Sequence, residues 1–392
     1  MGSSNRTCPS RAGRGPPGEP VLIELHESIA AAEPDDAHRD ALEALARCDA
    51  HGYHFVAALP SVTGRIVGRL RPAGLADRAF RRIAADETGW LPLQEVLPVS
   101  LRVEAGLTEP AWEGLPGAGV LRVPLLDCGR AGFERPAALV GENYDDAHLF
   151  ALVGRAFAAS RGLRGLQVSV DPVLGGGTTT PGVYARWQAE ARPCLAVVDG
   201  DRRYPGGPVG AVARAMERAD DAGAPLAAWL ALPVRAAENA LPHALIREVA
   251  LGDSAVARAL AQHERMQARG LSDVLDVADL RAGTPYYEAL ANHGSAQRRA
   301  FWQGTLPSIR SCPAVPTPSM PCRAACEAGG RDACRCPMVL GFGSVLGRAV
   351  GALGRRSPHK SWEAVDDRTR ETWELVGARV AAWGAARAPL RS

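Results

Sequence analysis

Lysine is almost absent from this chain of 392 residues. Of its 45 lysine and arginine residues, only Lys360 is lysine and the others are arginine. A P-loop needs glycine and then lysine directly before serine or threonine, and Lys360 follows Ser-Pro-His without a glycine. The chain therefore carries no standard Walker A motif, which excludes a P-loop ATPase within it.

Long apolar runs are also missing. No stretch of about 18 apolar residues, the length that a membrane span needs, occurs in the sequence. Residues 1–20 are rich in Gly, Pro, Ser and Arg and lack the apolar centre of a signal peptide. We therefore expect a disordered tail over these residues, a cytoplasmic location and no membrane partner. The net charge is only +2, so any surface for nucleic acid must be a local patch.

The apolar pattern divides the rest of the chain into four parts. Apolar spacings of three and four from Val21 to about Leu101 predict a mainly helical N-terminal domain over residues 21–135, in which residues 120–126 are extended; we assign this domain no role. Residues 136–240 alternate short apolar runs with helical patterns. A helical segment over 241–305 and a Cys-rich, helical C-terminal part over 306–392 follow. In that last part, we expect Val376, Val380 and Trp383 to pack into the core.

The alternating segment carries the clearest prediction of fold. Its expected strands cover 137–140, 166–170, 194–198 and 226–232, with a break at Asp171-Pro172. Its expected helices cover 145–160, about 181–190 and 209–222. Strands that alternate with helices predict an α/β domain whose parallel four-stranded sheet is covered by helices on both faces.

Carboxylates follow three of the four expected strands. Glu142 and Asp146 follow the first, Asp199 and Asp201 the third, and Glu238 the fourth. Because the carboxyl ends of parallel strands meet at one edge of a sheet, we expect these side chains to gather there.

The spacing of these acids supports a common site. Glu142 and Asp146 are four residues apart, which is one face of a helix. Asp199 and Asp201 are two apart, so an extended strand end would point both the same way. Such a cluster repels itself and needs cations, and oxygen ligands favour Mg²⁺ or Mn²⁺ over Zn²⁺. The alternative is that each acid only caps a helix N-terminus, which we expect of Asp145.

These motifs resemble a TOPRIM domain, especially that of OLD-family (overcoming lysogenization defect) nucleases. The resemblance covers about a quarter of the chain, residues 137–239, and its motifs occur in the family's order. They are Glu142 and Asp146, the glycine-rich loop Gly175–Gly177, Asp199 and Asp201, and an Arg-x-x-Glu-Asn formed by Arg235, Glu238 and Asn239.

The resemblance implies cleavage or nicking of DNA, or RNA, with two Mg²⁺ or Mn²⁺ ions held by the five acids. Such ions activate a water and stabilise the leaving oxygen. Arg235 and Lys360 become candidate catalytic cations, since the family often has a lysine near the metals, and Arg202 or Arg203 are substitutes for it. OLD nucleases also contain an ATPase domain, so a separate ATPase partner is implied.

The sequence departs from the family pattern at the first motif and in its lack of a lysine near the acids. Asn143 stands where the family usually has glycine, and Gly141 precedes Glu142 instead. These departures favour a second interpretation, a non-catalytic nucleic-acid-binding or assembly protein with a degenerate acidic site and a structural zinc. An oligomer is compatible with both interpretations, and neither fixes DNA or RNA as the partner.

A cluster of five cysteines lies near the C-terminus. It has the spacing C-x9-C-x3-C-x7-C-x-C and consists of Cys312, Cys322, Cys326, Cys334 and Cys336. Four thiolates in tetrahedral geometry would make a structural zinc site, and the surrounding prolines and glycines do not form a packed core by themselves. Reduced, unligated cysteines and an iron–sulfur cluster are the alternatives.

Overall fold

The computed structural model describes most of the chain between residues 22 and 390. Residues 34, 87–89, 91–92, 94–95, 97–99, 114–119, 131, 164, 221–223, 225, 291–293 and 311–335 lie outside the described part, together with both ends. The expected tail over 1–20 and four cysteines of the cluster (Cys312, Cys322, Cys326 and Cys334) therefore fall outside the described residues. None of the described helices is both long and apolar enough to cross a membrane.

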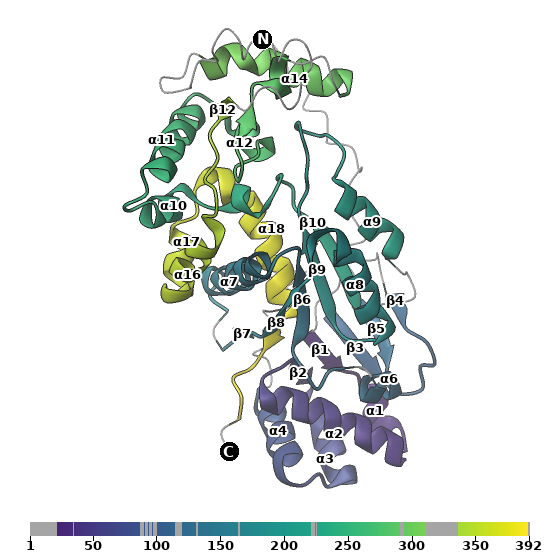
Figure 1. Cartoon of the computed structure of the whole chain (residues 1–392). Coiled ribbons are helices and arrows are strands. Elements are labelled where there is room, and N and C mark those ends of the chain that lie inside the picture. The colour runs from purple at the N-terminus through teal and green to yellow at the C-terminus, as the bar shows by residue number, and fades with distance from the viewer. Residues whose placement is uncertain are drawn as a thin grey trace, which may run out of the picture.

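A parallel four-stranded sheet lies at the centre of the molecule (Figure 1). Its strands are β6 (Ala137–Gly141), β8 (Val170–Leu174), β9 (Cys194–Val198) and β10 (Ala227–Ala231). They lie in the order β10-β9-β6-β8, and every neighbouring pair is parallel. This confirms the predicted first, third and fourth strands and the predicted α/β architecture with a parallel sheet.

Helices cover both faces of this sheet, as the alternating pattern predicts (Figure 1). One face carries α7 (Tyr144–Ser160) and α18 (Asp367–Trp383), and the other carries α8 (Thr180–Ala189) and α9 (Ala211–Ala219). Successive strand residues pack into opposite cores, so that Leu139 packs on the α7 side and Val140 on the α8 side. Val376, Val380 and Trp383 of α18 are buried, which confirms the predicted core positions.

The second strand corrects the prediction. It does not cover 166–170 but passes through Asp171-Pro172, which we expected to be a break, and Pro172 lies opposite Leu139 of β6. A proline is tolerated there because β8 is an edge strand, where one side of the backbone has no ladder partner. The preceding residues form a separate short strand, β7 (Gln167–Val168), which pairs antiparallel with β13 (Ala385–Ala386).

The described part of the N-terminal domain is mainly helical, as predicted, but it also contains a five-stranded sheet in the order β2-β1-β3-β5-β4, of which only the extended segment at β5 was expected. Its strands are β1 (Leu22–Leu25), β2 (Phe55–Ala58), β3 (Ser100–Glu104), β4 (Ala111–Glu113) and β5 (Val120–Pro124). Its helices are α1 (Glu27–Ala31), α2 (Asp36–His51), α3 (Pro60–Leu70), α4 (Gly74–Ala85) and α6 (Leu125–Arg130). Strands of three to five residues are too short to show a periodicity beside helices of 11 to 16 residues, so the helical pattern dominates the sequence.

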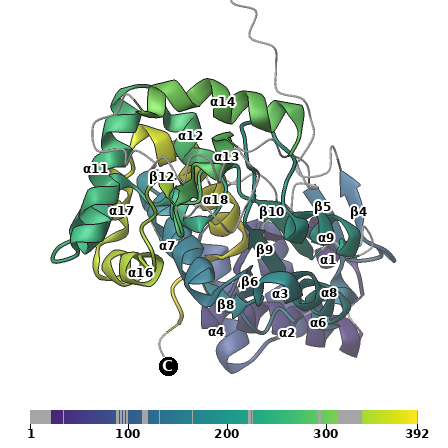
Figure 2. The same ribbon diagram turned by 45° about the horizontal axis from the view of Figure 1, so that its top comes forward.

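The helices between β10 and β12 form the end of the molecule that lies away from the N-terminal domain (Figure 1). They comprise the 3-10 helix η2 (Ala237–Ala240), α10 (His243–Val249), α11 (Ser254–Ala268), α12 (Ser272–Val277), α13 (Tyr287–Leu290) and α14 (Ala296–Arg310). Figure 2 shows α14 running across this end beside α13. β11 (Thr284–Pro285) pairs antiparallel with β12 (Pro337–Val339), and α16 (Leu346–Arg355) and α17 (Pro358–Glu363) complete this part.

The C-terminal segment returns to the N-terminal domain after α18. Arg387 donates to Asp49 Oδ1 at 2.7 Å and to Asp86 Oδ2 at 2.6 Å, and Asp49 is fully buried. The amide of Leu390 donates to the carbonyl oxygen of Ala50 at 2.7 Å. Because a buried carboxylate needs a partner, this ion-pair network ties the C-terminal segment to the N-terminal domain.

The close contact of α7 with α18 provides a test of the packing. A Cβ atom on Gly154 of α7 would lie 2.6 Å from Val380 Cγ1 of α18, whereas a Cβ on Gly304 of α14 would meet open space. We expect Gly154→Ala to lower the unfolding free energy by about 1–3 kcal/mol. Gly304→Ala should raise it by about 0.5–1 kcal/mol, because alanine lowers the entropy of the unfolded chain. Urea unfolding of both variants measures the difference, and equal midpoints would contradict the packing.

Candidate functional site

The first two acids lie at a tight turn between β6 and α7. A Cβ on Gly141 would lie 2.6 Å from the amide nitrogen of Ala147, so the helix starts directly against the strand end. The amide of Asn143 donates to Asp146 Oδ2 at 2.8 Å, and the Asn143 side chain donates to the same oxygen at 3.2 Å. Asp146, and not Asp145 as expected, thus caps the first turn of α7. Because Asn143 takes part in this capping interaction, the helix start explains why an asparagine stands at this position.

The glycine-rich loop after β8 lies against this turn. The amides of Gly176 and Gly177 donate to the carbonyl oxygen of Glu142 at 2.9 and 3.1 Å. Both glycines adopt positive φ angles, 81° and 62°, which other residues rarely adopt. The loop therefore fixes the backbone of Glu142 from the neighbouring strand.

A chain of hydrogen bonds joins three strand ends. The amide of Asp199, directly after β9, donates to Glu142 Oε1 at 2.9 Å. The amide of Ala237, after β10, donates to Asp199 Oδ1 at 3.1 Å. The ends of β6, β9 and β10 thus meet at one edge of the sheet, as the sequence predicts.

Burial and mutual repulsion perturb the acids at this edge. Burial raises the pKa of Glu142 to about 7, and the charges of Asp201 and Asp146 add to the effect. The pKa of Asp199 lies well above its ordinary value, first because of burial and then because of the charges of Glu142, Asp146, Glu238 and Asp201. Burial is also the main reason why the pKa values of Asp146 and Glu238 are raised. Asp199 therefore lies within electrostatic range of the other four acids.

Positive side chains do not neutralise this cluster within the described residues. None of the five carboxylates forms an ion pair with another described residue. In the same part of the chain, no three His, Cys, Asp or Glu side chains define a closed metal site. The donor chemistry nevertheless fits a hard divalent cation, because the cluster offers only carboxylate oxygens and a cation would relieve their repulsion.

Glu238 is held in place by its neighbour in η2. The fully buried Asn239 side chain accepts the amide of Ala236 at 3.0 Å. It donates to the carbonyl oxygens of Leu275 at 2.6 Å and Ala278 at 3.0 Å. The Asn of the Arg-x-x-Glu-Asn motif therefore anchors η2 to α12, and this places Glu238 beside Asp199.

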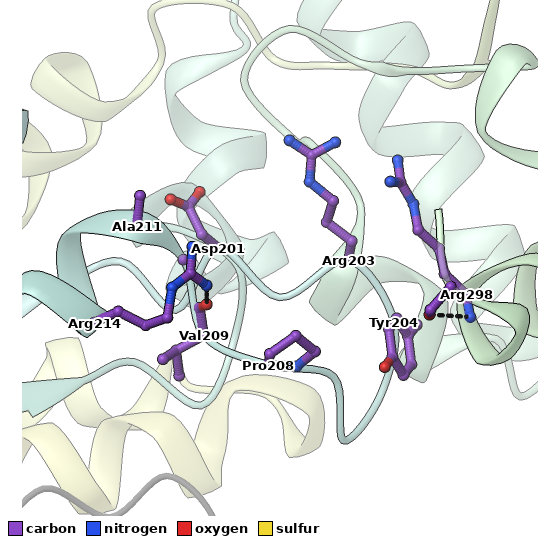
Figure 3. A pocket seen from close by; sticks show the side chains of 10 residues that line it. Asp201, Arg203, Tyr204, Pro208, Val209, Ala211, Arg214 and Arg298 are labelled. Carbon is purple, nitrogen blue, oxygen red and sulfur yellow. Dashed lines mark hydrogen bonds between the residues drawn. The ribbon is translucent and has the colours of Figure 1, made fainter. Parts of the chain in front are cut away.

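Asp201 does not point along an extended strand, which corrects the prediction from spacing. β9 ends at Val198, and a Cβ on Gly200 would lie 2.3 Å from the carbonyl oxygen of Val234. Asp201 itself has a φ angle of 50°, in the left-handed region. The chain thus turns between the two acids, so that Asp199 is largely enclosed and Asp201 is exposed beside a pocket (Figure 3).

The candidate cations are bound to other partners. The Arg235 guanidinium donates to Asp279 Oδ2 at 3.2 Å, and the Arg202 guanidinium donates to the carbonyl oxygen of Gly207. Arg203 pairs with Glu288 at 3.7 Å. Lys360 is exposed on α17, and no side-chain hydrogen bond or ion pair among the described residues joins it to the five acids.

Sequence reasoning missed one cation near the acids. The positive charge of Arg281 lowers the pKa of both Asp146 and Glu238, against the larger effect of burial. Its turn is fixed by Asp279, whose Oδ1 accepts the amides of Arg281 at 3.1 Å and Ala282 at 2.7 Å. Arg281 lies outside every motif, so no signal in the sequence indicates it.

Comparisons with known proteins found no matching family model, no matching curated protein and no matching solved structure. The resemblance to TOPRIM domains therefore stays a prediction that rests on the motifs and their order. The structure independently has a parallel sheet and three strand ends whose acids meet.

The perturbed pKa of Glu142 predicts a pH dependence of stability. Between about 4.5, its ordinary pKa, and about 7, the folded protein keeps a proton that the unfolded chain has lost. The unfolding free energy must therefore fall as the pH rises through this window, and the loss is complete above it. Glu142→Gln keeps the acceptor for the Asp199 amide and removes the charge.

We expect Glu142→Gln to raise the thermal midpoint relative to the unmodified chain above pH 7, with little difference at pH 4. Asp145→Asn is the matched control, since Asp145 is an exposed acid in the same turn. A midpoint for Glu142→Gln that is lower above pH 7 would contradict the prediction.

Proposed function

We propose that this chain is a metal-dependent phosphodiesterase that hydrolyses or nicks nucleic acid with a TOPRIM-type site. The observation that carries the proposal is the meeting of Glu142, Asp199 and Glu238 from three strand ends. Their mutual repulsion is a cost that their hydrogen bonds to backbone amides do not remove, and a bound cation would remove it.

The five acids would hold Mg²⁺ or Mn²⁺. When bound, such ions activate a water and stabilise the leaving oxygen of a phosphodiester. The chain itself orients the ligands, because the amides of Asp199 and Ala237 each fix one carboxylate oxygen and leave the other for a cation. Burial keeps these ligands from being screened by solvent, which strengthens their attraction for the cation.

One positively charged side chain of the protein, Arg281, lies close enough to the acids to contact the phosphate of a substrate. Arg281 is exposed and its charge reaches Asp146 and Glu238, so its guanidinium is suited to contact a phosphate oxygen there. We assign no role to Lys360. A separate ATPase partner and a zinc site at the cysteine cluster remain proposals from the sequence.

Cleavage assays test the proposal directly. We expect nicking of supercoiled plasmid or cleavage of single-stranded DNA or RNA with Mg²⁺ or Mn²⁺, and none with EDTA. Asp199→Asn should lower the rate by at least about a hundredfold, because it removes a charged ligand while the amide of Ala237 keeps an acceptor. Asp145→Asn is the control and should keep the rate.

Equal rates for Asp199→Asn and the unmodified chain would contradict this assignment of the site. No cleavage by the pure chain with either metal would instead favour the non-catalytic nucleic-acid-binding protein. The capping role of Asp146 supports that alternative, since a helix cap explains this acid without a metal.

Metal binding can be measured without any activity. Because a ligand that binds only the folded state stabilises it by mass action, Mg²⁺ or Mn²⁺ should raise the thermal midpoint. The rise should be largest above pH 7, where Glu142 is charged. It should be lost in Asp199→Asn and kept in Asp145→Asn, and a metal-independent midpoint across this pH range would argue against a metal site.

A further inference from the structure

A pocket of about 420 Å³ lies at the edge of the carboxylate cluster, and Asp201 is part of its lining (Figure 3). Three arginines line it, Arg203 from the loop after β9, Arg214 from α9 and Arg298 from α14, together with Tyr204. Figure 3 shows the carboxylate of Asp201 at one side of this pocket and Arg203 and Arg298 at the other. The pocket thus adjoins the candidate site and differs from it in charge.

The loop that carries Arg203 is held in a defined conformation. Trp302 Nε1, on α14, donates to the carbonyl oxygen of Arg203 at 2.8 Å. The amide of Gly207 donates to the carbonyl oxygen of Tyr204 at 3.0 Å, and the amide of Gly210 donates to that of Gly200 at 2.9 Å. A ligand would therefore meet arginines that are already positioned, which lowers the entropic cost of binding.

The arginines outnumber the acids that pair with them. Glu288 pairs with both Arg203 and Arg298, so one carboxylate faces two guanidinium groups. Arg214 donates to the carbonyl oxygen of Val209 and forms no ion pair with another described residue. The buried Nε of Arg298 lacks a hydrogen-bond partner within the described part of the chain. Three arginines thus outnumber the two acids beside them, Asp201 and Glu288, and Arg298 Nε adds a buried donor to this excess of positive charge.

We propose that this pocket binds a backbone phosphate of a nucleic-acid strand, next to the phosphate that is cleaved. The planar fork of arginine matches phosphate oxygens, and the Tyr204 ring offers a face for a base to stack on. A volume of about 420 Å³ is on the scale of one small ligand, so the pocket admits a single nucleotide but not a duplex. The strand is therefore unpaired at this point.

This inference rests on the proposed function for the position of the reacting phosphate. The positive pocket and the cation site would then hold neighbouring phosphates of one strand, with Asp201 between them. The substrate would therefore be a single strand, a flap or an unpaired end of nucleic acid.

Binding of a fluorescein-labelled single-stranded DNA oligonucleotide in EDTA, followed by anisotropy, tests the pocket without cleavage. We expect Arg214→Ala and Arg298→Ala each to weaken binding by about tenfold, the effect of losing one charge-assisted hydrogen bond. The slope of log affinity against log salt should decrease by about 0.7 for each lost phosphate contact. Arg65→Ala, at an exposed position of α3 in the N-terminal domain, is the control and should bind as the unmodified chain does.

Unchanged affinity in both pocket variants would overturn the inference, and so would equal or tighter binding of a blunt duplex. Arg214 is exposed and its replacement should not disturb folding, which thermal unfolding verifies. If the unmodified chain cleaves nothing but the pocket variants still bind the oligonucleotide more weakly, the phosphate pocket is confirmed and the nuclease proposal fails. If cleavage depends on Asp199 but the pocket variants bind normally, the nuclease proposal holds and the phosphate pocket is contradicted.

Discussion

The electrostatic repulsion among the carboxylates at one edge of the sheet is the constraint on which the candidate site depends. Acids from three strand ends lie in a buried environment without ion-pair partners among the described residues. The fold compensates with backbone amides, which donate to Glu142, Asp146 and Asp199. These hydrogen bonds fix one oxygen of each carboxylate but do not neutralise its charge, so the arrangement remains suited to a cation.

The segment after the sheet completes this edge. Asn239 joins η2 to α12, and the Trp373 side chain of α18 donates to the carbonyl oxygen of Ala240 at 2.7 Å. Glu238 is therefore positioned by elements that lie far from it in the sequence. The same segment brings Arg281 near the acids through a turn built on Asp279. The four-stranded sheet alone would not form the site, because the position of Glu238, the acid that follows the fourth strand, depends on these helices.

Asp201 connects the acidic edge with the arginine pocket. The turn at Gly200 separates it from Asp199, so one Asp-x-Asp motif contributes to two environments of opposite charge. Negative ligands for a cation beside positive ligands for a phosphate are the combination that a phosphodiester substrate requires, because its charge must be balanced on both sides of the reacting bond. The closeness of the acidic edge and the arginine pocket therefore supports both the cation site and the phosphate site.

The sequence by itself determined the strands β6, β9 and β10, the helices between them and the meeting of their acids. It did so because apolar runs that alternate with helical patterns imply parallel strands, whose carboxyl ends share one edge. Only the tertiary structure decided the rest. The N-terminal sheet, the passage of β8 through Pro172, the turn at Asp201, the cation Arg281 and the arginine pocket all depend on contacts between distant segments or on local backbone angles. Such contacts leave no periodic pattern along the chain, so the residues that make them cannot be recognised in one sequence.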